Sequence, residues 1–95
     1  MRIAVVGTGY VGLVSAACFA ELGHTVIGVD IDAAKIAKLK TGKSTIYEPG
    51  LEELLERGLQ RGSLSFTTDL SEALPQTQVL FCAVATPPNA DSSAD

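Results

Sequence analysis

The sequence predicts an α/β fold in which helices cover a parallel β-sheet. Short apolar runs alternate along the chain with segments of helical pattern, as they do in parallel sheets with right-handed crossovers. The first run, 2–6, leads directly into Gly7-Thr8-Gly9-Tyr10-Val11-Gly12, a glycine-rich turn of the kind that joins a strand to a helix. The hydrophobic content of 46% and the charged content of 19% are those of a globular chain.

Each element carries a local signal. Strands are expected at 2–6, 25–29, 64–67 and 79–85, and helices at 11–22, 33–40, 51–61 and 69–74. Gly23 follows the first helix as a left-handed C′ residue, and Asp32 precedes the second helix as its N-cap. Asp69 and Glu72 have the spacing of a capping box, and Pro75 is expected to stop the short helix that they open.

The expected strand order is 3-2-1-4, which makes a partial doubly wound sheet of Rossmann type. The strand at 79–85 is apolar throughout, and this predicts burial on both of its faces. The order reverses between the first and fourth strands, so the binding crevice should lie at their carboxyl ends. Thr86 would then lie beside the glycine loop, either as a ligand contact or as a turn residue before Pro87.

The glycine spacing predicts a dinucleotide site. Gly7 permits the tight turn, Gly9 lets the backbone approach a pyrophosphate, and Gly12 lets the next helix pack closely on the strand. The N-terminus of that helix offers free N–H groups and the positive end of its dipole to phosphates. Asp30 ends the second strand at close to the ~20 residues after the motif that are typical of a ribose-binding carboxylate.

The charges near Asp30 favour NAD over NADP. A carboxylate accepts hydrogen bonds from ribose hydroxyls and repels a 2′-phosphate, and Asp32 adds a second negative charge. Lys35 has two interpretations: a cation that offsets part of this repulsion, or a solvated residue on the outer face of the second helix.

Composition argues against other classes of partner. The net charge of −4 and the pI of 4.8 leave no basic patch for nucleic acid or for an anionic membrane. The sequence shows neither a signal-peptide pattern nor the ~18 apolar residues that a membrane-spanning helix needs, so we expect a cytoplasmic protein.

The cysteines and the histidine are interpreted as structural. Cys18 and Cys82 have no metal-binding spacing, and their apolar surroundings predict small core residues in a reducing compartment. We expect no metal site. His24 follows Gly23 and is interpreted as a residue of the helix C-terminal turn.

Several motifs, taken together and in order, resemble the UDP-glucose 6-dehydrogenase family of nucleotide-sugar 6-dehydrogenases. They are Gly7-Thr8-Gly9-Tyr10-Val11-Gly12, Val29-Asp30 with Lys35, Tyr47-Glu48-Pro49-Gly50-Leu51, Thr67-Thr68-Asp69 and Val84-Ala85-Thr86-Pro87-Pro88. GDP-mannose and UDP-N-acetylmannosamine dehydrogenases share much of this pattern. The sequence departs from the family pattern at Ala85 and Ser92, where many relatives have glycine.

The resemblance implies an activity and a set of cofactor contacts. Such enzymes oxidise the C6 alcohol of a nucleotide sugar to a carboxylate with two NAD. By position, Val11, Asp30, Lys35 and Thr86 would contact NAD. The family's catalytic cysteine and sugar pocket lie downstream of the matching region, so we expect no catalytic residue here and no turnover by this chain alone.

We therefore expect residues 1–88 to be the amino-terminal part of an NAD-binding domain and 89–95 to be a disordered tail. Two alternatives stay open: a stand-alone dinucleotide sensor and a scaffold piece that binds no ligand. Glu48 either lines a substrate pocket or belongs to a helix start beside Pro49. The apolar strand Val79–Val84 would leave an open sheet edge, which predicts self-association or a homo-oligomer.

Overall fold

The structure, a computed structural model, describes residues 1–46 and 48–83. Its sheet has the order β3-β2-β1-β4, and each neighbouring pair of strands is parallel. The strands are β1 (Arg2–Val6), β2 (Thr25–Val29), β3 (Leu64–Thr67) and β4 (Val79–Cys82). The helices are α1 (Tyr10–Glu21), α2 (Ala33–Lys40), α3 (Leu51–Arg61), α4 (Leu70–Ala73) and the 3₁₀ turn η1 (Leu74–Gln76). The predicted fold class and strand order are confirmed.

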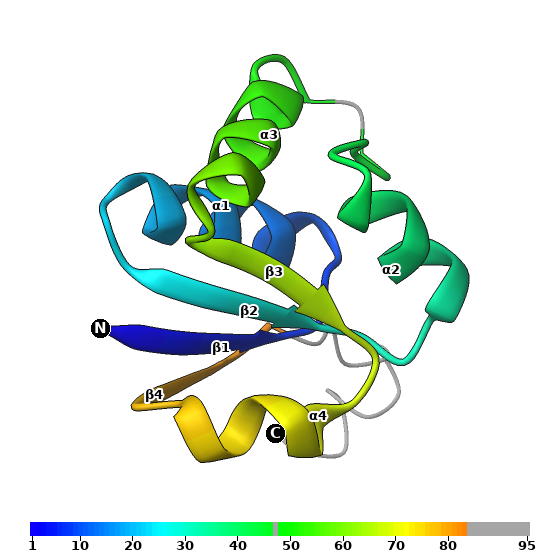
Figure 1. The fold of residues 1–95 in the computed structure, drawn as a ribbon. Coiled ribbons are helices and arrows are strands. Elements are labelled where there is room, and N and C mark those ends of the chain that lie inside the picture. The colour runs from blue at the N-terminus through cyan, green and yellow to red at the C-terminus, as the bar shows by residue number, and fades with distance from the viewer. Residues whose placement is uncertain (47, 84–95) are drawn as a thin grey trace, which may run out of the picture.

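The two faces of the sheet are covered unequally (Figure 1). Helices α1, α2 and α3 lie on one face, and α4 with η1 lies on the other. The main core lies under the three helices, where Val5, Leu13, Val26 and Leu55 are fully buried. The core on the α4 face is much smaller and consists of Ala4, Val29 and Ala73, with Val6 and Ile27 packed against it.

Small side chains let α1 pack closely on the sheet. Its buried side comprises Gly12, Leu13, Ala16, Ala17 and Ala20. A Cβ added at Gly12 would lie 1.8 Å from the carbonyl oxygen of Gly7, so only glycine fits there. The helix begins one residue earlier than predicted and ends one residue earlier.

The C-terminus of α1 follows the predicted turn. Gly23 has a φ of +102°, the left-handed conformation that glycine adopts at little cost. The His24 N–H donates to the Phe19 carbonyl at 3.1 Å, and the Gly23 N–H donates to the Ala20 carbonyl at 3.1 Å. This is the pair of bonds that ends a helix in a Schellman motif, so the interpretation of His24 as a turn residue is confirmed.

The parallel register brings the carboxyl ends of all four strands to one edge. Val6 is paired with both Val29 and Cys82, and Val29 is paired with Thr67. The chain therefore leaves each strand at the same edge, and the segments that follow β1 and β2 meet there, as a doubly wound sheet requires.

The burial predicted for the fourth strand is wrong. β4 ends at Cys82, residues 84–85 of the predicted strand lie outside the described residues, and Val79 and Leu80 are 40% and 48% exposed. Within the described residues β4 pairs only with β1, so it is an edge strand, and α4 with η1 covers little of it.

The interpretation of both cysteines as core residues is also wrong. Cys18 and Cys82 are exposed free thiols. Cys18 lies on α1 outside the buried row that contains Ala16, Ala17 and Ala20, because the helical period turns it to solvent. Cys82 is exposed because its strand lies at the sheet edge.

The predicted capping box at α4 is replaced by another arrangement. The Asp69 carboxylate accepts from the Ser71 N–H at 2.9 Å and so caps the helix. Glu72 accepts from the Thr67 hydroxyl at 2.6 Å instead of reaching back to the Asp69 N–H, which donates to that same hydroxyl oxygen. Pro75 lies inside η1, so the chain continues as a 3₁₀ turn where a stop was expected.

We predict that Gly12→Ala destabilises the fold by at least about 2 kcal/mol, because the new methyl group overlaps the Gly7 backbone. This cost exceeds the about 1 kcal/mol that alanine gains over glycine in a helix. Gly9→Ala is the matched control, since a Cβ there meets nothing within 4 Å. Urea unfolding measures both variants, and equal stability of the two would contradict the prediction.

Candidate functional site

A cavity of about 590 Å³ opens at the carboxyl edge of the sheet, beside the glycine loop and the start of α1. The residues that line it are Gly7, Thr8, Gly9, Tyr10, Val11, Asp30, Lys35 and Ala83. The structure therefore brings together most of the cofactor residues predicted from the sequence. Gly12 lies behind the cavity against the Gly7 carbonyl, and Thr86 lies outside the described residues.

The glycine loop leaves space where a ligand would lie. Gly7 has a φ of +98°, so the turn out of β1 uses a conformation that favours glycine. Gly9 has an ordinary φ of −71°, and a Cβ there would meet nothing within 4 Å. Neither backbone conformation nor packing of the protein explains a glycine at position 9, whereas the close approach of a bound group would.

The N-terminus of α1 is open toward this cavity. Gly9 is the N-cap and makes no side-chain capping hydrogen bond, and the first turn carries no acidic residue. The first N–H groups of a helix have no partner within the helix, and they lie at the positive end of its dipole. Together with the loop they form a site for an anionic group such as a phosphate.

Asp30 holds the glycine loop to the end of β2. Its Oδ2 accepts from the Thr8 N–H at 3.0 Å and from the Thr8 hydroxyl at 2.7 Å, and its Oδ1 accepts from the Asp32 N–H at 3.0 Å. The Lys35 ammonium lies 3.6 Å from Oδ2. Of the two interpretations of Lys35, the one that puts its charge beside Asp30 agrees with the structure.

These contacts keep Asp30 ionised. Burial of the side chain, which is 14% exposed, raises the pKa, but four contacts that favour the carboxylate outweigh it. They are the Asp32 N–H, the Thr8 N–H, the Thr8 hydroxyl and the charge of Lys35, and the pKa falls from 3.8 to about 2. The site therefore presents a negative charge at neutral pH.

Thr8 lines the cavity and also makes contacts that the sequence did not predict. The residue is 1% exposed, and both its N–H and its hydroxyl donate to Asp30. Sequence reasoning missed this contact because Thr8 and Asp30 come from different loops. The predicted strand order, which places β1 beside β2, could have indicated the contact between Thr8 and Asp30.

A second cavity, of about 440 Å³, lies on the α4 side of Asp30. It is lined by Val6, Gly7, Val29, Asp30, Ile31, Thr68 and Leu70. Gly7 and Asp30 line both cavities, so the two spaces adjoin across the carboxylate. Ile31 is 94% exposed and Leu70 is 37% exposed, which leaves an apolar surface beside Asp30. The sequence analysis did not single out these two residues.

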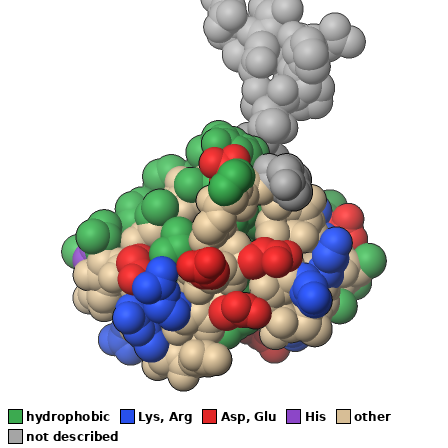
Figure 2. All heavy atoms as spheres, turned by 90° about the horizontal axis from the view of Figure 1, so that it is seen from above, with side chains coloured by type: hydrophobic (Ala, Val, Ile, Leu, Met, Phe, Trp, Pro, Cys, Tyr) green, Lys and Arg blue, Asp and Glu red, His purple; other side chains and the backbone are tan. Residues whose placement is uncertain are grey.

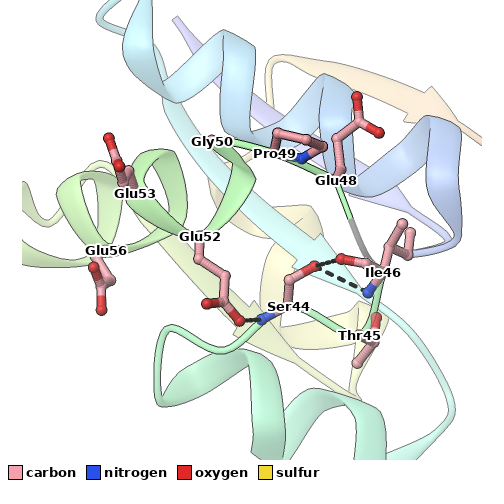
Figure 3. Close-up of a pocket in the computed structure, with 9 residues that line it drawn as sticks. All are labelled: Ser44, Thr45, Ile46, Glu48, Pro49, Gly50, Glu52, Glu53 and Glu56. Atoms are coloured by element: carbon pink, nitrogen blue, oxygen red, sulfur yellow. Dashed lines mark hydrogen bonds between the residues drawn. The ribbon is translucent and has the colours of Figure 1, made fainter.

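A larger cavity, of about 710 Å³, lies elsewhere (Figure 3). It is formed by the segment between α2 and α3 and by α3 itself, and Glu48, Glu52, Glu53 and Glu56 are among its lining residues. Figure 2 shows acidic side chains gathered on this helical side of the molecule. Four carboxylates would repel phosphates, so the glycine-loop cavity is the better anion site despite its smaller volume.

The described residues contain no group of three or more His, Cys, Asp or Glu side chains that could hold a metal ion. Within the same residues, every helix is too short or too polar to cross a bilayer.

Comparisons with known proteins agree with this geometry. The family profile described as the NAD binding domain of the UDP-glucose/GDP-mannose dehydrogenase family matches residues 1–95. A UDP-glucose 6-dehydrogenase from Pseudomonas aeruginosa is 50% identical over 95 residues, which are 100% of this chain and 21% of that protein. A GDP-mannose 6-dehydrogenase from Pseudomonas syringae is 52% identical over 87 residues, 92% of this chain and 20% of that protein.

Solved structures give the same result. A GDP-mannose dehydrogenase from Pseudomonas aeruginosa superposes with a TM-score of 0.89 at 52% identity over 92% of this chain and 20% of that chain. A UDP-glucose dehydrogenase from Pyrobaculum islandicum superposes with a TM-score of 0.87 at 48% identity over the same shares of the two chains. The chain thus spans about a fifth of the length of the relatives that it matches.

We predict that Asp30→Asn lowers stability by up to about 2 kcal/mol at neutral pH. The folded-state pKa of Asp30 is about 2 against a usual 3.8, so its contribution is present above about pH 4. That contribution is lost as the pH falls toward 2. Urea unfolding of the wild type and the variant from pH 7 to pH 3 measures the difference.

Glu53→Gln, which removes an exposed α3 carboxylate away from the loop, is the control for the loss of one charge. A constant difference between wild type and Asp30→Asn across the whole pH range would show that ionisation of Asp30 does not stabilise the fold.

Proposed function

This chain belongs to the UDP-glucose/GDP-mannose dehydrogenase family as its NAD-binding domain, and from that premise we propose how its own residues hold NAD. The observation that carries the proposal is the glycine loop, which joins an open helix N-terminus to the ionised Asp30 across one cavity. The cofactor lies across the carboxyl ends of β4, β1 and β2, since Ala83 after β4 lines the same cavity as Gly7 after β1 and Asp30 after β2.

The pyrophosphate occupies the space above Gly9. The backbone N–H groups at the start of α1 donate to its oxygens, and the absent side chain at Gly9 lets the phosphates come close. Tyr10 and Val11 line the same cavity and are 55% and 59% exposed, so they contact the cofactor from the helix side.

The adenosine half of NAD lies around Asp30, with its ribose at the carboxylate and its adenine ring in the second cavity. The carboxylate accepts hydrogen bonds from the ribose hydroxyls, and Lys35 stands beside it. The adenine ring lies in the apolar cavity next to Ile31 and Leu70, where a flat apolar ring finds the surface that it needs. Thr86 is kept as a proposed contact, although it lies outside the described residues.

The parent enzyme is an NAD-dependent oxidoreductase of nucleotide sugars. We propose that it oxidises UDP-glucose to UDP-glucuronate with two NAD, in keeping with the 50% identity to a UDP-glucose 6-dehydrogenase. GDP-mannose is the second candidate substrate, because a GDP-mannose 6-dehydrogenase is 52% identical over a slightly shorter range. UDP-N-acetylmannosamine is the third, since a dehydrogenase for it from Staphylococcus aureus superposes with a TM-score of 0.84.

The site of action that we propose is the cytoplasm. Cys18 and Cys82 are exposed free thiols, and exposed thiols persist in a reducing compartment.

We predict that this chain binds NADH and that it binds NADPH more weakly. The Asp30 carboxylate accepts from the ribose hydroxyls of NADH but repels the 2′-phosphate of NADPH. Calorimetric titration with each nucleotide at fixed salt measures both affinities. Tighter binding of NADPH would contradict the assignment of Asp30.

Three variants locate the site in the same titration. Gly9→Val should abolish binding and leave the fold intact, because its side chain fills the pyrophosphate space, and Gly9→Ala should give an intermediate loss. Asp30→Ala should weaken binding by roughly 1.5–3 kcal/mol, the scale of a hydrogen bond to a charged group. Unchanged affinity in every variant would mean that the loop is only a structural turn.

We further predict that the isolated chain self-associates through β4. Among residues 1–46 and 48–83, no strand pairs with the outer edge of β4, and Val79 and Leu80 add exposed apolar surface. Sedimentation velocity across a concentration series should show dimers or larger species. Leu80→Lys is the matched variant, and it should favour the monomer. A monomer at all concentrations, with slow hydrogen exchange in β4, would contradict the prediction.

A further inference from the structure

The two oxygens of the Asp30 carboxylate have different surroundings. Oδ2 accepts two hydrogen bonds from Thr8, at 3.0 Å from the N–H and 2.7 Å from the hydroxyl, and the Lys35 ammonium lies 3.6 Å away. Oδ1 accepts one hydrogen bond, from the Asp32 N–H at 3.0 Å. A carboxylate oxygen has about two lone-pair sites, so Oδ2 is filled, and Oδ1 keeps a free acceptor site among the described residues.

Thr8 is held firmly in the position from which it makes these bonds. It is the one buried polar side chain in the described part of the chain, at 1% exposed. Its methyl group faces Gly28, and a Cβ added there would lie 3.6 Å from it. Gly28 itself leaves room for the Phe66 ring, which a Cβ would approach to 2.7 Å. Because Thr8 is packed on this side, its hydroxyl has little freedom to turn away from Asp30.

We infer that Thr8 is a positioning residue for cofactor selectivity: it fixes the Asp30 carboxylate so that Oδ1 faces the ribose and Oδ2 holds Lys35. The inference rests on the proposed NAD site and adds a role of the Thr8 side chain that is exerted through Asp30. Binding of NADPH would require the carboxylate to turn away and release the Lys35 ammonium to the 2′-phosphate. The two hydrogen bonds from Thr8 oppose that rotation.

The test measures NADH and NADPH affinities of Thr8→Val and Thr8→Ser by calorimetry. Thr8→Val keeps the shape but loses the hydroxyl, so Asp30 is held less firmly and NADH binding should weaken roughly tenfold, within the range of coupling between residues of one hydrogen-bond network. NADPH binding should weaken less or improve, so the ratio of the NADH affinity to the NADPH affinity should fall. Thr8→Ser keeps the hydroxyl and should preserve the ratio to within about twofold.

Thr77→Val is the matched control. Its hydroxyl donates to the Ala73 carbonyl at 2.7 Å, at the amino end of β4 and away from the glycine loop. Thr77→Val makes the same change of side chain and loses a hydroxyl hydrogen bond, to a neutral carbonyl, and it should leave the ratio unchanged. Thr8→Ala provides a smaller replacement if Thr8→Val fails to fold, and the same fall in ratio is expected. A ratio unchanged in Thr8→Val or Thr8→Ala, or an equal loss for both nucleotides, overturns the inference.

A titration without nucleotide separates this inference from the proposed function. The ¹³C signal of the Asp30 carboxyl reports its ionisation directly. The midpoint of this titration is the pKa of Asp30, and Thr8→Val should raise it because the hydroxyl hydrogen bond to the carboxylate is lost. Thr8→Ser keeps the hydroxyl and should keep the wild-type midpoint. A midpoint equal in wild type and Thr8→Val overturns the contact. Failure of the wild type to bind either nucleotide overturns the proposed function and the selectivity role with it, even where the midpoint moves as expected.

Discussion

The contact between the Gly7 carbonyl and the backbone of Gly12 is the constraint on which the rest of this molecule depends. A single added carbon at Gly12 would lie 1.8 Å from that oxygen, so α1 can approach β1 this closely only because position 12 is glycine. The approach aims the N-terminus of α1 at the carboxyl edge of the sheet. It also packs the row of small α1 residues against the sheet, which is where the main core forms.

Asp30 connects the glycine loop after β1 to the end of β2. It ends β2, and its carboxylate binds the loop that follows β1, so the geometry of the loop depends on the pairing of the two strands. A buried carboxylate is costly when it lacks partners, and Thr8, Asp32 and Lys35 supply them. The same contacts that stabilise the charge leave an acceptor site on Oδ1, the one that we propose for the ribose. In this proposal, one side chain serves both stability and recognition.

The two faces of the sheet are covered unequally, and this leaves apolar surface exposed at β4 and beside Asp30. Three helices bury one face, whereas α4 and η1 are short and contact mainly β2 and β3. The apolar composition of β4 would suit a strand buried on both faces, but its position at the sheet edge leaves Val79 and Leu80 exposed in this chain. The same short helix leaves the apolar cavity at Ile31 and Leu70 open beside Asp30, where we propose that the adenine ring lies.

The sequence by itself determined the order and kind of the elements, the strand order, the glycine loop and the importance of Asp30. These follow from local period, capping residues and spacing, which are readable along a single segment. Only the tertiary structure decided that Thr8 turns inward to Asp30, that Lys35 reaches Oδ2, and that Cys18, Cys82 and β4 are exposed. The reason is physical: such contacts depend on which strands lie side by side and on what covers each face. Residues that are neighbours in sequence do not carry that information.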